Sequence, residues 1–153
     1  MKRFAVMLQL MLLAGVLSWA SASGAGGEVI AVVVNDAAGA KKLSRDELKS
    51  IFQTRMTRLP SGEKATPVNL PQGDSARVSF DQAVLGLSPD EVARYWVDRK
   101  IRGGNRPPKK LTSSALVLKH VARTPGAIGY VPVAKAKGVM VVARIQGGRV
   151  VSP

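Results

Sequence analysis

The stretch TPVNLPQGDSARVSF, residues 66–80, decides the fold, because it joins a strand, a loop and a helix start in direct succession. Thr66, Val68 and Leu70 alternate with the residues between them, which is the period of a half-buried β-strand. A Pro-Gln-Gly sequence then breaks the strand. Apolar residues recur at helical spacing from there to Leu87, so the stretch predicts a strand-loop-helix unit.

The start of this predicted helix offers groups that can bind an anion. Asp74 or Ser75 can cap the helix, and its first turn presents backbone N–H groups and the positive end of the helix dipole. The Ser75 hydroxyl and the Arg77 guanidinium would add donors. The alternative is an ordinary turn in which Asp74 is only the cap, and the local residues by themselves favour that alternative.

The N-terminus has the pattern of a signal peptide. Lys2 and Arg3 precede an apolar run from Phe4 onward, and small residues up to Ala22 form a cleavage site, with Ala25 as the second choice. The apolar run is short for a membrane-spanning helix. The predicted organisation is a signal peptide at 1–22, a flexible tail at 23–27 and one folded domain at 28–153.

Composition narrows the class of protein. The formal net charge of +13 falls to +11 once Lys2 and Arg3 leave with the signal peptide. A strongly positive net charge favours anionic partners such as small oxyanions, acidic lipid headgroups or nucleic acid. Export of the protein argues against nucleic acid. The alternative is that the basic surface only keeps the protein soluble. The sequence contains no cysteine, which excludes disulfides and thiolate chemistry and fits a bacterial periplasm.

Two further helix starts carry the same signal. Ser44 with Glu47, and Ser88 with Glu91, have the spacing of a capping box, and apolar residues flank each box as in a hydrophobic staple. These pairs predict one helix that ends near Gln53 and another that begins after residue 88.

The remaining elements follow from apolar patterning and turn residues. They are a strand at 29–34, a helix from 112 or 113 to 123, a strand at 127–131, a helical turn within 132–137, a strand at 139–145 and a hairpin into 150–151. This order predicts an α/β fold, a three-layer αβα lobe with a mixed, mostly parallel sheet. Ligands in such folds bind beyond the carboxyl ends of strands, where residues 69–77 would lie.

The densest basic cluster extends from Arg99 to Lys110, and its glycines and prolines predict a loop. A solvated connector is the preferred interpretation of this cluster. The alternative is a basic rim that steers anions toward the protein. Phe80, Tyr95 and Trp96 are assigned to the core.

Candidates for catalysis and metal binding are few. His120 is the single histidine, and its position among apolar residues predicts a packed or half-exposed helix residue. The acidic residues are scattered, and neither cysteine nor a second histidine is available to complete a metal site. We therefore expect no enzymatic activity, no metal and no cofactor.

Three segments resemble the substrate-binding proteins of phosphate ABC transporters, a family of type II periplasmic binding proteins. LSRDELKSIF at 43–52 resembles a family helix, and residues 66–80 resemble the strand and loop that carry DGSGT. TPGAIGYV at 124–131 is nearly identical to a family signature and is the most specific match. The matched material, from 29 to about 142, is similar to one of the two family lobes, which identifies a short single-lobe member.

The resemblance implies that phosphate or a related oxyanion binds at the helix start. The expected contacts share one loop and helical turn: Gly73, Asp74, Ser75, Ala76 and Arg77, with Asn69 as an accessory. Ser75 matches the serine that donates its hydroxyl and amide to phosphate. The following Gly-Thr pair is replaced by Ala76-Arg77, and the upstream arginine by Asn69 or Leu70, which implies weak binding or binding completed by a partner.

Two functions follow from the resemblance. The first is an exported, periplasmic module that binds phosphate or a related oxyanion and is linked to ABC-type phosphate uptake. The alternative is a non-transport accessory or protein-interaction module that keeps the fold without tight phosphate binding. The partners expected are phosphate or a similar oxyanion, an ABC permease or another periplasmic protein, and a second copy of the chain that rebuilds a two-sided cleft.

Overall fold

The computed structural model describes residues 27–153. The predicted signal peptide at 1–22 and all but the last residue of the predicted tail lie outside the described residues. Within 27–153, no helix combines the length and the apolar character needed to cross a membrane.

Six strands form one sheet in the order β3-β2-β4-β1-β5-β6. The strands are β1 (Ile30–Val34), β2 (Thr66–Asn69), β3 (Lys109–Lys110), β4 (Ala127–Pro132), β5 (Met140–Gln146) and β6 (Arg149–Val151). The helices are α1 (Arg45–Phe52), α2 (Ser75–Phe80), α3 (Pro89–Ile101) and α4 (Ser114–Arg123), with a π-helical segment at Asp81–Leu85 and 3₁₀ turns at Asp36–Ala38 and Val133–Lys135. The predicted α/β class is confirmed, and the short strand β3 is an addition to the predicted order.

The sheet is mixed, as predicted. β2 pairs in parallel with β3 and β4, whereas β1 lies antiparallel between β4 and β5, and β5 pairs antiparallel with β6. Four of the six strands therefore point in one direction, although only two of the five pairings are parallel. Strands of the same direction are not all neighbours, because β1, the first strand in the chain, inserts between the two consecutive strands β4 and β5.

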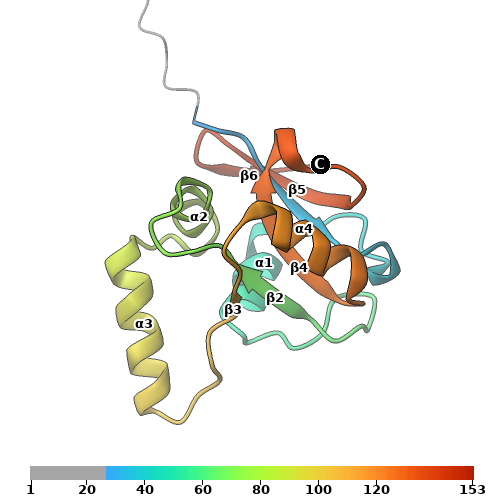
Figure 1. The fold of residues 1–153 in the computed structure, drawn as a ribbon. Coiled ribbons are helices and arrows are strands. Elements are labelled where there is room, and N and C mark those ends of the chain that lie inside the picture. The colour runs from blue at the N-terminus through green and yellow to red at the C-terminus, as the bar shows by residue number, and fades with distance from the viewer. Residues whose placement is uncertain (1–26) are drawn as a thin grey trace, which may run out of the picture.

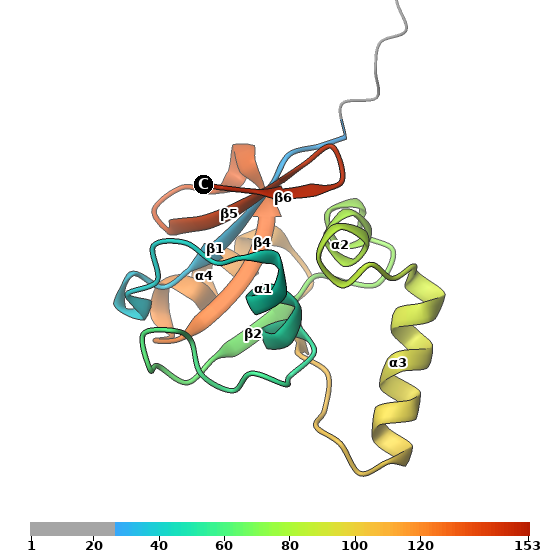
Figure 2. The ribbon, with the colours of Figure 1, turned by 180° about the vertical axis from the view of Figure 1, so that it is seen from behind.

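Helices cover both faces of the sheet, which gives the predicted three layers. α4 lies on one face (Figure 1), and α1 and α2 lie on the other (Figure 2). Every residue of β1 is buried, as expected of a strand covered on both sides. Phe80 stacks on Tyr130 with ring centroids 4.0 Å apart, and Phe52 contacts Phe80 at 4.5 Å, so these rings join α1, α2 and β4.

Both predicted capping boxes are present. The Ser44 backbone N–H donates to the Glu47 carboxylate at 2.7 Å, and the Ser88 N–H donates to Glu91 at 2.7 Å. In return, each serine hydroxyl accepts a hydrogen bond from the backbone N–H of its glutamate. These contacts are complete within four residues, which is why the sequence predicts both helix starts correctly.

α3 adds little to the core, since Val92 is its one buried residue. The helix continues into the 99–110 cluster predicted as a loop, because no glycine interrupts it before Gly103. The loop prediction is therefore wrong for the first three residues of the cluster, and it is wrong for the last two because they pair with β2 as β3. Tyr95 and Trp96, assigned to the core, are only partly buried. α3 stands away from the sheet beside the body of the domain (Figures 1 and 2), so these rings have few groups to pack against.

Candidate functional site

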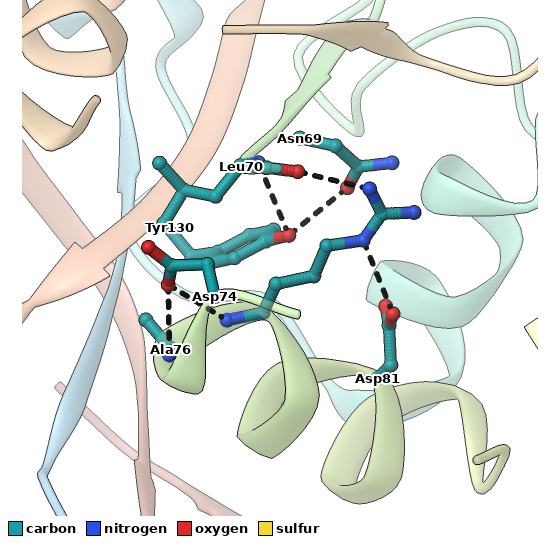
Figure 3. Close-up of polar contacts among 7 residues, drawn as sticks. Asn69, Leu70, Asp74, Ala76, Asp81 and Tyr130 are labelled. Carbon is teal, nitrogen blue, oxygen red and sulfur yellow. Dashed lines mark hydrogen bonds and ion pairs between the residues drawn. The ribbon is translucent and has the colours of Figure 1, made fainter. Parts of the chain in front are cut away.

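The candidate site lies where β2 ends and α2 begins, at the carboxyl end of β2. Asp74 is the N-cap of α2, and its side chain accepts hydrogen bonds from the backbone N–H groups of Ala76 at 2.9 Å and Arg77 at 3.4 Å (Figure 3). Two amides of the first turn therefore already have a carboxylate partner. Asp74 acts as the cap, as the alternative interpretation of this turn required.

The Arg77 side chain points back into the protein. Its Nη1 donates to the carbonyl oxygen of Leu70 at 2.9 Å, and its Nε donates to Asp81 at 3.3 Å. Only 13% of the Arg77 side chain and 6% of the Asp81 side chain are exposed. The guanidinium thus links the end of β2 to the π-helical segment, and two of its donors are used within the fold.

Tyr130 holds the last residues of β2 from the neighbouring strand β4. Its hydroxyl donates to Asn69 Oδ1 at 3.2 Å and accepts from the backbone N–H of Leu70 at 3.4 Å (Figure 3). Burial raises the pKa of Tyr130 well above its usual range, so the hydroxyl stays protonated. The predicted accessory residue Asn69 is itself 6% exposed and is positioned by this bond.

Asp81 is a buried carboxyl beside the site. Its burial raises the pKa to about 6, and the charge of Arg77 partly opposes that shift. Sequence reasoning missed both Asp81 and Tyr130. The four-residue spacing from Arg77 to Asp81 was a usable signal for the first, and the single polar side chain in the apolar strand AIGYV was a usable signal for the second.

The predicted site residues lie together, but they face different ways. Gly73 has a φ of 87°, a left-handed conformation that glycine adopts without strain, and it places Asp74 over the helix end. Ala76 is buried, Arg77 points inward, and Ser75 is exposed. Among the described residues, no hydrogen bond involves the Ser75 hydroxyl, so Ser75 is the predicted contact that faces outward with an unused donor.

The side chains that bind metals do not cluster in the described part of the chain. No group of three His, Cys, Asp or Glu side chains gathers there at metal-binding distance. His120 is partly buried on α4, as predicted for a helix residue next to the core. The chemistry that the site offers is recognition of charge by an exposed hydroxyl, backbone amides and a nearby guanidinium.

Comparisons with known proteins point to one family. No family model matches the chain. The sequence is 35% identical over 107 residues to the phosphate-binding protein PstS of Bacillus subtilis, covering 66% of this chain and 30% of that protein. The fold is similar to an ABC-type phosphate transport receptor from Vibrio cholerae, with a TM-score of 0.59 and 18% identity over 76% of this chain and 47% of that chain.

A second solved structure agrees. PstS from Borrelia burgdorferi superposes with a TM-score of 0.59 and 15% identity over 75% of this chain and 46% of that chain. These relatives are named for binding or transporting phosphate and not for a reaction. The chain spans less than half the length of each. In sequence, the chain is similar to part of the phosphate-binding protein PstS, and its fold is similar to part of the phosphate ABC transporter substrate-binding proteins.

Proposed function

We propose that the chain is an exported, periplasmic module that binds phosphate or a related oxyanion weakly at the start of α2. The observation that carries the proposal is the outward position of Ser75, the first residue of α2, directly beyond the carboxyl end of β2. The similarity to PstS supports phosphate as the ligand class, and the signal-peptide pattern at 1–22 supports export.

The geometry explains why this binding would be weak. An incoming anion meets the Asp74 carboxylate, which already accepts from the amides of Ala76 and Arg77. The anion must displace a tethered carboxylate or share its donors, and like charges at this distance repel. Arg77 is engaged with Leu70 and Asp81 and offers only its remaining N–H groups. The net charge, +11 after loss of Lys2 and Arg3, still attracts anions to the protein as a whole.

Titration calorimetry of residues 23–153 with phosphate and sulfate tests the proposal. We expect weak binding to the unaltered chain and its loss in Ser75→Ala. In Asp74→Asn, binding should strengthen several-fold, because asparagine still caps the helix but carries no negative charge. Ser61→Ala, an exposed serine in another loop, is the matched control and should bind like the unaltered chain. Absence of binding in all four proteins would overturn the proposal.

A second candidate is a non-transport accessory or protein-interaction module. It is favoured by the internal pairing of Asp74 and Arg77, because the loop keeps its shape with no anion bound. Thermal shifts separate the two candidates, since a ligand that binds only the native state raises the melting temperature. A shift with phosphate that disappears in Ser75→Ala supports oxyanion binding. No shift, together with a homodimer or a periplasmic partner in solution, supports the interaction module.

A role in phosphate uptake would require an ABC permease that recognises this chain. Uptake of labelled phosphate by cells with and without the protein tests that role. Slower uptake in the deletion strain, restored by the unaltered chain and not by Ser75→Ala, would link transport to the site. Equal uptake in both strains would exclude a role in phosphate uptake, and oxyanion binding would then be judged from the calorimetry alone.

A further inference from the structure

A groove runs along α3, on an element that does not contribute to the candidate oxyanion site. Its volume is about 440 Å³. Residues of α3 form one wall, and residues of the loop that follows the helix form the other. The lining residues, which we call the α3 groove, are Trp96, Val97, Lys100, Gly104, Asn105, Arg106 and Pro107.

Hydrogen bonds hold both walls of the α3 groove in place. On the helix side, the Tyr95 hydroxyl donates to the carbonyl of Gln53, the residue after α1, at 3.4 Å. On the loop side, Asn105 Nδ2 donates to the carbonyl of Thr54 at 3.0 Å. The groove is therefore formed before any partner arrives, which lowers the entropy cost of binding.

Close packing of the turn joins the two walls. The Gly104 N–H donates to the carbonyl of Arg99 at 2.8 Å. A Cβ atom on Gly104 would lie 3.0 Å from that same carbonyl oxygen. The Arg99 guanidinium also lies 5.9 Å from the centroid of the Tyr95 ring. Glycine is thus the residue that lets the chain turn back against the end of α3 and shape the groove.

Two apolar side chains of α3 are exposed. Val97, which lines the α3 groove, is 59% exposed, and Ile101, which is on the next turn and outside the groove lining, is 78% exposed. Both are apolar groups on a helix whose one buried residue is Val92. Single exposed apolar residues are ordinary, but a group of them beside a preformed hollow marks a docking surface.

The segment that contains the α3 groove is strongly basic, and two of its basic side chains, Lys100 and Arg106, line the groove. Residues 94–110 contain seven basic side chains and one acid, Asp98, which pairs with Arg102 at 3.0 Å. The basic residues are Arg94, Arg99, Lys100, Arg102, Arg106, Lys109 and Lys110. Trp96 and Val97 together with Lys100 and Arg106 complement an apolar side chain that is flanked by carboxylates.

We propose that the α3 groove docks an acidic polypeptide segment of a partner protein. An apolar side chain of that segment packs against Trp96 and Val97, and carboxylates on either side pair with Lys100 and Arg106. A second copy of this chain is a poor occupant, because two chains with a net charge of +11 each, after loss of Lys2 and Arg3, repel. A flat lipid surface fits a concave groove less well than a peptide does. The proposal does not rest on oxyanion binding at α2.

Selection from a displayed library of random short peptides tests the proposal on residues 23–153. We expect enriched peptides that combine Asp or Glu with a central apolar residue. The affinity of one such peptide, measured by fluorescence anisotropy, should fall about tenfold or more in Val97→Glu and in Lys100→Glu. Matched controls are Val151→Glu and Lys137→Glu, which alter exposed residues of the same types elsewhere and should not change the affinity.

Any of four outcomes would overturn the proposal. The selection could yield no enriched peptide, or enriched peptides without acidic residues. Val97→Glu could bind the peptide as tightly as the unaltered chain does, or the protein could bind phosphatidylglycerol vesicles and no peptide. Val97 is exposed, so its substitution should leave the fold intact, and circular dichroism of each variant verifies this. Phosphate calorimetry on Val97→Glu gives an independent readout. Unchanged oxyanion binding together with lost peptide binding would show that the two sites are separate.

Discussion

Arg77 and Asp81 form an ion pair across the junction between α2 and the π-helical segment, with Arg77 Nε 3.3 Å from Asp81 Oδ2 and both side chains largely buried. A buried pair of this kind depends on both partners, because either charge left alone is poorly solvated. The same guanidinium donates to the Leu70 carbonyl, so the pair also fixes the end of β2. The basic residue closest to the candidate oxyanion site therefore has a structural role before any anion binds.

Replacing Arg77 by methionine should lower the free energy of unfolding by about 3 kcal/mol, since Asp81 then lies buried without a counter-charge. The double variant Arg77→Met/Asp81→Leu should have a smaller loss of unfolding free energy than Arg77→Met alone, because no uncompensated charge remains. Urea unfolding at pH 7 measures both. Arg102→Met is a matched control. Arg102 forms the same i,i+4 contact with Asp98, but the two side chains are 75% and 55% exposed.

Arg102→Met should change the free energy of unfolding very little, because exposed ion pairs contribute about 0–1 kcal/mol to stability. Equal losses in Arg77→Met and Arg102→Met would show that the Arg77 pair contributes no more than a surface pair does. A double variant less stable than Arg77→Met would show that Asp81 has stabilising partners other than Arg77.

The raised pKa of Asp81 predicts a pH dependence of stability. Burial raises this pKa from 3.8 to about 6, so the folded protein holds the proton more tightly than the unfolded chain does. The stability gained from protonation is fully present below pH 3.8 and is lost as the pH rises through 6. The stability of the unaltered chain relative to Asp81→Asn should therefore fall by about 2–3 kcal/mol between pH 4 and pH 7.

Urea unfolding of both proteins across that pH range measures the difference. Asp98→Asn removes one exposed carboxylate and serves as the control for the change in net charge. A constant difference between the unaltered chain and Asp81→Asn would show that Asp81 titrates alike in the folded and unfolded states.

Gly129 lies in β4 at a point where the chain has no room for a side chain. A Cβ atom there would lie 2.6 Å from a methyl group of Val117 on α4 and 3.0 Å from a methyl group of Val68 on β2. Gly129→Ala should therefore lower the free energy of unfolding by about 1–3 kcal/mol through overpacking. Gly27→Ala is the control, because no atom of the described residues, apart from the chain neighbours, lies within 4 Å of a Cβ at Gly27. If Gly129→Ala unfolds at the same temperature as the unaltered chain, then α4 can shift away from β4 without loss of stability.

The features that the sequence predicts correctly are local ones. The capping boxes at Ser44 and Ser88 close within four residues, so their chemistry is contained in a short segment. The continuous run at 29–34 likewise specifies a strand covered on both faces. Insertion of β1 between β4 and β5 cannot be predicted in this way, because it depends on pairing between strands about a hundred residues apart.

The site follows the same rule. The helix start and its cap are local, and both were among the predicted alternatives. The direction of Arg77 depends on the carbonyl of Leu70 and on a buried partner in the next turn. The position of Asn69 depends on Tyr130, which is 61 residues away. Local patterning identifies which residues gather at the loop, whereas long-range contacts decide which of them remain available to a ligand.

The two capping boxes should differ in what they stabilise. α1 buries Leu48, Ile51 and Phe52, so fraying its start weakens the core. α3 buries Val92 alone, so its first turn can open with little effect on the rest of the domain. Ser44→Ala should therefore lower the global free energy of unfolding by about 1 kcal/mol. Ser88→Ala should lower it by clearly less.

Amide hydrogen exchange separates the two effects. In Ser88→Ala, faster exchange should be confined to the first turns of α3 and to the loop that lines the α3 groove. In Ser44→Ala, faster exchange should extend through α1 to β4, because the ring centroids of Phe52 on α1 and Tyr130 on β4 lie 5.8 Å apart. If Ser88→Ala destabilises the whole domain as much as Ser44→Ala does, then α3 is coupled to the core. The α3 groove would then form only as part of the global fold.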